Sequence, residues 1–283
     1  MNDDLLIEAI YLFNKHFNQE GKSDLPENIE VAVLRILAAN NYISYDNNFI
    51  ITKVNYQNLE KFKNQINEEA LPENIKNISP VSFFDNITDI EYEIYSRSNY
   101  SVSFKNGLKL AELINFNDLK ILDIGGNSGG LASAIASKYL TSHITVVDTK
   151  IPCEIGSEYK EVNNLNNINF ICDDLFTFNL EKYDYIILSN IFHDYNDKDV
   201  RRILKNINTH LDDNTKVIIL EDILDNEIGP IDVVMHGLRL SINTFYGKQR
   251  TINELNILIS EIGLNLLNKE KINQVQSIVV YTL

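Results

Sequence analysis

The stretch LKILDIGGNSGG, residues Leu119–Gly130, decides the fold of this chain. Its apolar residues Ile121, Leu122 and Ile124 predict a short buried strand of a parallel sheet. The glycine-rich run GGNSGG ends that strand, and the alanine-rich segment LASAIASKYL behind it predicts a helix. A strand, a glycine turn and a helix are typical of the start of a nucleotide-binding unit. Glycines let the backbone turn sharply and approach a ligand that faces the helix N-terminus.

A second predicted strand, HITVVD, ends in the carboxylate of Asp148. A carboxylate at this place can accept hydrogen bonds from both hydroxyls of a ribose. The two strands together are compatible with a nicotinamide, a flavin or an S-adenosylmethionine (SAM) protein. A glycine turn without any ligand is the plainer alternative.

Length and composition exclude several classes of protein. The chain has 283 residues, a 44% hydrophobic fraction and a net charge of −15. The length leaves room for two domains, and the hydrophobic fraction indicates a folded core. The negative charge argues against a nucleic-acid or anionic-membrane partner. The N-terminus MNDDLL lacks the pattern of a signal peptide, and no apolar run approaches the roughly 18 residues of a membrane span. Cys153 and Cys172 form neither a metal motif nor a disulfide framework, so we expect a soluble, cytoplasmic protein.

The first part of the chain predicts helices over residues 4–17 and 27–40, followed by a β-hairpin within YISYDNNFIIT. Helices followed by a hairpin are typical of a winged-helix domain. The acidic balance favours dimerisation over DNA binding for this domain. A helix expected over Tyr100–Phe116 leads into the glycine turn. We therefore predict a dimerisation domain with a helical connector over residues 1–95 and a nucleotide-binding domain over residues 96–283.

Beyond Asp148, strands and helices continue to alternate, which predicts a mostly parallel α/β sheet covered on both faces. The tail LNLLNKEKINQVQSIVVYTL predicts two strands without a helix between them, hence an antiparallel hairpin at the sheet edge. Titratable side chains recur at or just beyond the carboxyl ends of the predicted strands, where ligands of such sheets bind. They are Asp123, Asp148, Asp174, His193 and Glu221. We expect them in one cleft.

The order LDIGGNSGG, VVD, DDLF, SNIFHDYND, ILED and GKQRT resembles the small-molecule SAM-dependent O-methyltransferases of the caffeate and hydroxyindole type, including their bacterial relatives. The resemblance covers roughly residues 95–283. It implies a class I, Rossmann-like SAM-methyltransferase domain, a winged-helix-like dimerisation domain, a homodimer and methyl transfer to a hydroxyl of a small aromatic metabolite.

The resemblance also assigns cofactor-binding residues. It implies that Gly125 meets the methionine portion of SAM, that Asp148 binds the ribose, and that Asp174 and Leu175 flank the adenine. Ser189 is implied to lie near the cofactor. Ser101 is matched to a serine that reaches the SAM carboxylate. Asn127 replaces a glycine of the family turn, a change that Asn tolerates.

His193 matches the family's catalytic histidine, with Tyr195 in the place of a tryptophan. A hydroxyl with a pKa near 10 is a poor nucleophile at neutral pH, and a histidine can take its proton as it attacks the methyl group. Glu221 matches the acid that orients the histidine ring. A second supporting acid of plant members is replaced here by Gln249. A histidine that only caps the turn after the strand is the alternative.

The segment 235–251 is expected to line the acceptor pocket, with Met235, His236 and Asn243 as substrate-binding residues. Packing of an amphipathic helix against a dimer partner explains the same pattern. His193 and His236 raise the question of a metal, but no third ligand is apparent, and we predict none.

Other functions remain open from the sequence. Methyl transfer to nitrogen or carbon of a small metabolite is one, because the second acid is missing. A non-catalytic winged-helix regulator that binds SAM is another, although Arg35 is the only basic residue on the segment 27–40. A nicotinamide oxidoreductase would leave Asp174 and the HDY element without a role.

Overall fold

The computed structural model describes residues 2–18, 21–46, 51–55, 59, 66–78, 82–225, 231–273 and 275–283. The chain forms two compact units, each discontinuous in sequence. One unit comprises Met1–Asn86, His193–Asn196 and Asp222–Glu254, and we call it the helical unit. The other comprises Ile87–Phe192, Asp197–Glu221 and Leu255–Leu283, and we call it the sheet unit.

A seven-stranded sheet with the order β5-β4-β3-β6-β7-β9-β8 forms the centre of the sheet unit. Its strands are β3 (Lys120–Ile124), β4 (His143–Asp148), β5 (Ile168–Cys172), β6 (Tyr185–Ser189), β7 (Lys216–Asp222), β8 (Asn265–Lys271) and β9 (Gln276–Thr282). The pairs β3–β4, β3–β6, β4–β5 and β6–β7 are parallel, whereas β8 and β9 are antiparallel. The predicted α/β sheet with an antiparallel C-terminal hairpin is confirmed.

The chain order changes direction between β3 and β6, since β4 and β5 extend the sheet on one side and β6 and β7 on the other. Ligands of open α/β sheets bind beyond the carboxyl ends of the strands at such a switch point. Gly125 directly follows β3, and Ser189 is the last residue of β6. The topology therefore places both residues at the expected ligand edge.

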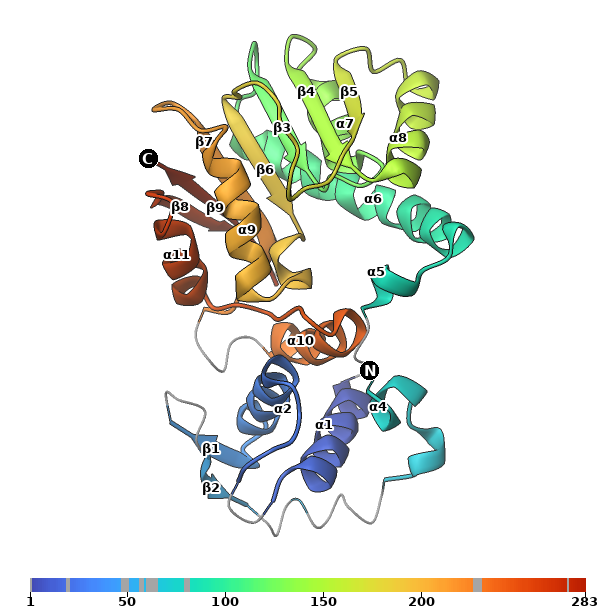
Figure 1. Ribbon diagram of the computed structural model, residues 1–283, viewed down its shortest axis with the longest axis vertical. Helices are drawn as coiled ribbons and strands as arrows, with labels where there is room; N and C mark the ends of the chain where they lie inside the picture. The colour runs from blue at the N-terminus through green and yellow to red at the C-terminus, as the bar shows by residue number, and fades with distance from the viewer. Residues whose placement is uncertain are drawn as a thin grey trace. The chain divides into compact units, whose positions relative to one another are not determined.

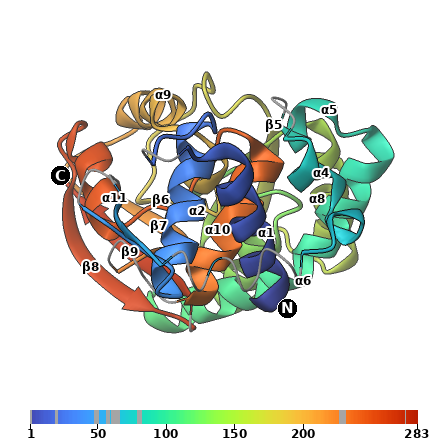
Figure 2. The same ribbon diagram turned by 90° about the horizontal axis from the view of Figure 1, so that it is seen from below.

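Helices cover both faces of this sheet. They are α6 (Asp89–Leu113), α7 (Gly130–Lys138), α8 (Lys150–Val162), α9 (Asp197–Asn208) and α11 (Ile252–Ser260), with the short η2 (Phe192–Asp194) after β6. Figures 1 and 2 show α6 and α9 on opposite faces of the sheet. Apolar side chains of β3, β4, β6 and α7 form a completely buried core, among them Ile121, Val146, Ile187 and Ile135.

Helix α6 is longer than the sequence predicted. It begins at Asp89 instead of Tyr100 and ends at Leu113. A capping box defines its start, because the Thr88 side chain accepts from the Glu91 N–H and the Glu91 carboxylate accepts from the Thr88 N–H. The additional turns bring Tyr92 and Ser96 into the sheet unit.

The helical unit contains α1 (Asn2–His16), α2 (Glu27–Ala39), β1 (Ile43–Tyr45), β2 (Ile51–Val54), η1 (Glu68–Ala70), α4 (Glu73–Lys76), α5 (Phe83–Asn86) and α10 (Ile231–Thr244). The two predicted N-terminal helices are confirmed. Strands β1 and β2 pair antiparallel, but Asn47 and Asn48 of the predicted turn lie outside the described residues. Helix α10 packs against both α1 and α2 (Figure 2).

The division expected from the sequence, a dimerisation domain over 1–95 and a SAM-binding domain over 96–283, stays a prediction about what each part does. The compact units have different bounds because His193–Asn196 and Asp222–Glu254 pack with the N-terminal helices. The winged-helix character and the dimer also remain predictions.

The first testable prediction concerns the packing of α6 on α7. A Cβ added to Gly107 would lie 2.6 Å from the Leu131 carbonyl oxygen and 2.8 Å from Ala134 Cβ. We expect Gly107→Ala to lower the free energy of unfolding by about 1–2 kcal/mol, although Ala favours a helix over Gly by about 1 kcal/mol. Urea denaturation measures this, with the exposed Lys105→Ala on the same helix as control. A stabilised Gly107→Ala protein would contradict the close approach of the two helices.

Candidate functional site

The glycine turn after β3 uses backbone conformations that few residues adopt. Gly125 has a φ of 64°, Asn127 of 52° and Gly129 of 74°. The Gly125 N–H donates to the Val147 carbonyl at 2.8 Å, and a Cβ on Gly125 would lie 2.3 Å from Ile191 Cδ1. The positive φ therefore favours glycine at position 125, and a larger residue would also have to displace the end of the Ile191 side chain. Asn127 takes the left-handed conformation expected of it.

Asp148 connects the end of β4 to this turn. Its Oδ2 accepts from the Asn127 N–H at 2.8 Å, and its Oδ1 accepts from the Thr149 N–H at 2.7 Å. Burial raises the pKa of Asp148 above its ordinary value, and these hydrogen bonds oppose part of that shift. Oδ1 also accepts from Thr149 Oγ1 at 3.3 Å, so a ribose hydroxyl would have to bind at Oδ2 or replace a contact of this side chain.

Tyr92 of α6 is a residue that the sequence analysis missed. Its hydroxyl lies 3.0 Å from Thr149 Oγ1, next to Asp148. Burial first, and the Asp148 charge second, raise the pKa of Tyr92 to about 12. The capping box at Thr88 is the signal that could have placed Tyr92 on α6.

Asp123 does not reach the ligand edge with the other acids, contrary to our expectation. Its side chain is completely buried, and neither carboxylate oxygen has a hydrogen-bond partner in the described part of the chain. A Cβ on Gly126 would lie 2.5 Å from Asp123 Oδ2, so the turn covers this carboxyl group. Burial, with the Asp148 charge adding to it, raises the pKa of Asp123 to about 8. Asp123 is therefore protonated at neutral pH.

The remaining predicted cofactor residues lie at the same edge or beside it. Asp174 is exposed after β5, and its Oδ1 accepts from the Phe176 N–H at 2.8 Å. Leu175 and Ser189 are half-buried. Ser101 is exposed on α6. The carbonyl of Ser96, on the same helix, accepts a hydrogen bond from Ser128 Oγ of the glycine turn at 3.0 Å. The structure thus brings Gly125, Asp148, Asp174 and Ser189 to the ends of four adjacent strands.

His193 belongs to the helical unit and lies in a group of charged side chains. His236 and Arg250 are part of this group, together with Asp194 and Asp222. Burial is the main cause that lowers the pKa of His193 to about 4. Asp222 opposes this shift, and His236 and Arg250 add to it. The imidazole is therefore neutral above about pH 4.

His236 and Arg250 have well-defined partners of their own. His236 Nδ1 lies 3.1 Å from Asp222 Oδ2, and its side chain is half-exposed. Arg250 is buried and donates from Nη2 to the Tyr195 carbonyl at 2.8 Å. The sequence analysis had assigned no role to Asp222 or Arg250.

Glu221 is buried at the end of β7, in the sheet unit. Its Oε1 accepts from the N–H groups of Ile191 and Phe192 at 3.1 and 2.6 Å. The carboxylate thereby fixes the backbone that immediately precedes His193.

The three predicted acceptor-binding residues of α10 have different surroundings. Met235 is buried, His236 contacts Asp222, and Asn243 is exposed and accepts from Asn74 Nδ2 at 2.9 Å. The structure brings His236 into the charged group around His193, but it orients Asn243 toward α4. As acceptor-binding residues all three stay predictions.

Two further properties concern the whole described part of the chain. Its His, Cys, Asp and Glu residues form no cluster of three or more that could hold a metal ion. None of its helices combines the length and the apolar character required to cross a bilayer.

The buried Asp123 generates a prediction about stability. The folded protein holds a proton at Asp123 up to about pH 8, whereas the unfolded chain loses it near pH 4. The wild type therefore loses stability as pH rises through this window, and Asp123→Asn removes that loss. We expect the difference in unfolding free energy, variant minus wild type, to increase as the pH is raised from 5 to 8. The limiting slope is about 1.4 kcal/mol per pH unit.

Urea denaturation over this pH range measures the difference, with the exposed Asp213→Asn as control. Parallel pH dependences of Asp123→Asn and wild type would show that Asp123 is ionised in the folded protein.

Comparison with known proteins agrees with this architecture. A family model described as an O-methyltransferase domain matches residues 83–265. O-methyltransferase 7 of Dictyostelium discoideum is 26% identical over 217 residues, which are 72% of this chain and 61% of that protein. The chain spans only 47% to 61% of the length of the first curated relatives.

Solved structures show the same fold at low sequence identity. An O-methyltransferase family 2 protein of Planctomyces limnophilus, in complex with apigenin, has a TM-score of 0.81 at 16% identity, with 99% of this chain and 93% of that chain covered. Human N-acetylserotonin methyltransferase in complex with SAM has a TM-score of 0.65 at 16% identity, with 98% and 92% covered. The domain match spans more than half of the chain, from α5 to the start of β8. The chain belongs to the O-methyltransferase family that this domain defines.

Proposed function

We propose that this chain transfers the methyl group of SAM to a hydroxyl of a small aromatic molecule, with His193 as general base. The observation that carries the proposal is the O-methyltransferase domain match over residues 83–265. It includes both the strand ends that bear Gly125, Asp148 and Asp174 and the turn that bears His193.

The residues of the sheet unit fit SAM chemically. Gly125 presents main chain at a positive φ that favours glycine, and Asp148 at the end of β4 offers Oδ2, which has one main-chain donor, to a ribose hydroxyl. Asp174 and Leu175 offer an exposed acceptor and an apolar surface for the adenine. The cofactor, when bound, supplies an electrophilic methyl group on a sulfonium. The SAM complex of the human relative supports this assignment.

His193 supplies the base. Its imidazole is neutral at the pH of a cell because burial lowers its pKa to about 4. A neutral imidazole can accept the proton of an acceptor hydroxyl as the oxygen attacks, whereas an imidazolium cannot. Glu221 holds the backbone at Ile191 and Phe192, and we propose that it thereby orients His193.

The acceptor class follows from relatives. Apigenin occupies the Planctomyces structure, and the human enzyme is named for N-acetylserotonin. Both molecules carry a hydroxyl on an aromatic ring. We propose an acceptor of this kind and use the two compounds as probes. The helical unit, by family resemblance, is proposed to form a homodimer.

The cofactor assignment predicts the binding of S-adenosylhomocysteine. We expect the protein to bind it in the micromolar range and to ignore NAD. Asp148→Ala should weaken this binding by about 10- to 100-fold, because the hydrogen bonds from the ribose to the Asp148 carboxyl group are lost. Isothermal calorimetry measures both. Glu181→Ala, which removes an exposed carboxylate at the amino end of the sheet, serves as control. Preference for NAD would overturn the proposal.

The base assignment predicts a separate loss. His193→Ala should lower kcat by about 10²- to 10⁴-fold with little change in S-adenosylhomocysteine affinity. Methyl transfer to apigenin and N-acetylserotonin from labelled SAM measures kcat, and the exposed His143→Ala is the matched control. Since His193 loses its proton at about pH 4, wild-type kcat/KM should fall only when the pH approaches that value. An unimpaired His193→Ala rate would exclude the base role.

A further inference from the structure

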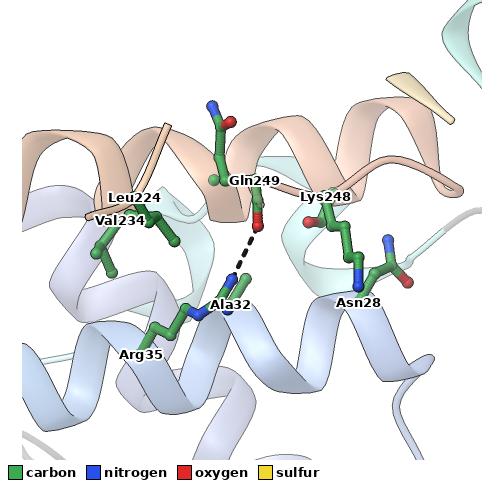
Figure 3. A pocket seen from close by; sticks show the side chains of 9 residues that line it. Asn28, Ala32, Arg35, Leu224, Val234, Lys248 and Gln249 are labelled. Carbon is green, nitrogen blue, oxygen red and sulfur yellow. Dashed lines mark hydrogen bonds between the residues drawn. The ribbon is translucent and has the colours of Figure 1, made fainter. Parts of the chain in front are cut away.

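Helix α2 carries a buried cation that contacts a distant segment of the helical unit. The Arg35 side chain is only 4% exposed, and arginine is rarely buried without partners. Its Nη1 donates to the Gln249 carbonyl at 2.8 Å, and its Nη2 lies 3.4 Å from Glu254 Oε2. Figure 3 shows the guanidinium reaching this carbonyl, while the Gln249 side chain points away from α2.

Asn28, two turns earlier on the same face of α2, contacts the same segment. Its Nδ2 donates to the carbonyls of Phe245 and Gly247 at 3.0 and 2.8 Å. Asn28 and Arg35 thus hold three carbonyl groups of residues 245–249. Phe245 has a φ of 59°, a conformation that costs free energy for a bulky residue. The hydrogen bonds from α2 therefore stabilise a segment whose backbone conformation at Phe245 is unfavourable by itself.

This segment contacts the turn that carries His193. A Cβ on Gly247 would lie 2.1 Å from the His193 carbonyl oxygen, so the two backbones touch. Arg250, next to Gln249, donates to the Tyr195 carbonyl at 2.8 Å. Helix α2 therefore contacts residues 245–250, and residues 245–250 in turn contact the backbone of His193 and of Tyr195.

The charged side chains around His193 affect the protonation of its imidazole. Asp194 faces the imidazole from its own turn, Asp222 from the end of β7 and His236 from α10. Arg250 is the charged group contributed by the held segment, and its guanidinium disfavours protonation of His193. If the segment moved, this positive charge would move with it.

We propose that Arg35 is a positioning residue for methyl transfer, which holds residues 245–250 and thereby fixes Arg250 and the His193 turn. The proposal rests on the base role of His193 in the proposed function. The clamp formed by Asn28 and Arg35 makes the N-terminal helix part of the catalytic arrangement.

Arg35→Ala tests the clamp. We expect kcat for the aromatic probes to fall by about 10- to 100-fold, as for a slightly misplaced catalytic group, with unchanged S-adenosylhomocysteine affinity. The pKa of His193 should rise, because the Arg250 charge that helps to lower it is no longer held beside the ring, whereas the larger effect of burial remains. NMR titration of labelled histidine follows this change in the absence of any acceptor.

Lys53→Ala is the control, because Lys53 is an exposed cation of the same helical unit and lies outside residues 245–250. We expect it to leave both kcat and the His193 titration as in wild type. Asn28→Ala removes two of the three carbonyl contacts and keeps the buried charge, so it tests the clamp if Arg35→Ala fails to fold.

Chemical rescue provides a second readout. A pocket beside Arg35 is lined also by Ala32 and Ser241, and the truncation in Arg35→Ala enlarges it. Millimolar guanidinium should enter the space left in Arg35→Ala and restore part of kcat. A variant that loses only thermal stability, with kcat and the His193 titration unchanged, would overturn the proposal. Wild-type protein that transfers no methyl group would refute the proposed function, and the titration would still decide on the clamp.

Discussion

The hydrogen bond from the Asn127 N–H to the Asp148 carboxylate is the contact on which the sheet unit depends. It fastens the glycine turn after β3 to the end of β4, and its geometry requires the positive φ of Asn127. The same turn covers Asp123, which excludes water from that carboxyl group and keeps it protonated at neutral pH. Burial raises the pKa of both neighbouring acids, but only Asp148 accepts main-chain N–H groups, which oppose that shift.

The helical unit arranges charge in a different way. Burial makes His193 a weak base, and the charges of Asp222, His236 and Arg250 adjust that basicity in opposite directions. None of these three partners comes from the turn that carries His193. They come from β7, from α10 and from the segment before α11, and α2 holds that segment in place. The state of one imidazole therefore depends on four separate parts of the chain.

Short-range patterns in the sequence account for the part of the fold that could be predicted. The glycine turn, the strands and the C-terminal hairpin follow from short-range signals, namely apolar runs, glycine positions and the alternation of elements. The early start of α6 was also encoded locally, in the pair Thr88 and Glu91, but the polar, proline-interrupted residues before it suggested a connector.

Long-range packing explains the rest. The amphipathic pattern of α10 shows that one face is buried, but it cannot specify that α1 and α2 cover it. The burial of Asp123 depends on how closely Gly126 approaches it, which spacing along the sequence cannot reveal. The hydrogen bond from Arg35 to the Gln249 carbonyl joins residues far apart in the chain, and no local pattern around Arg35 indicates it.

Hydrogen–deuterium exchange with and without S-adenosylhomocysteine tests the central claim, that the carboxyl ends of β3, β4 and β5 form the cofactor site. The account predicts slower exchange on ligand addition at residues 125–130, 148–150 and 173–176. It predicts no change at the amino ends of the same strands. Protection at those amino ends, or no protection at the three turns despite measurable binding, would contradict it.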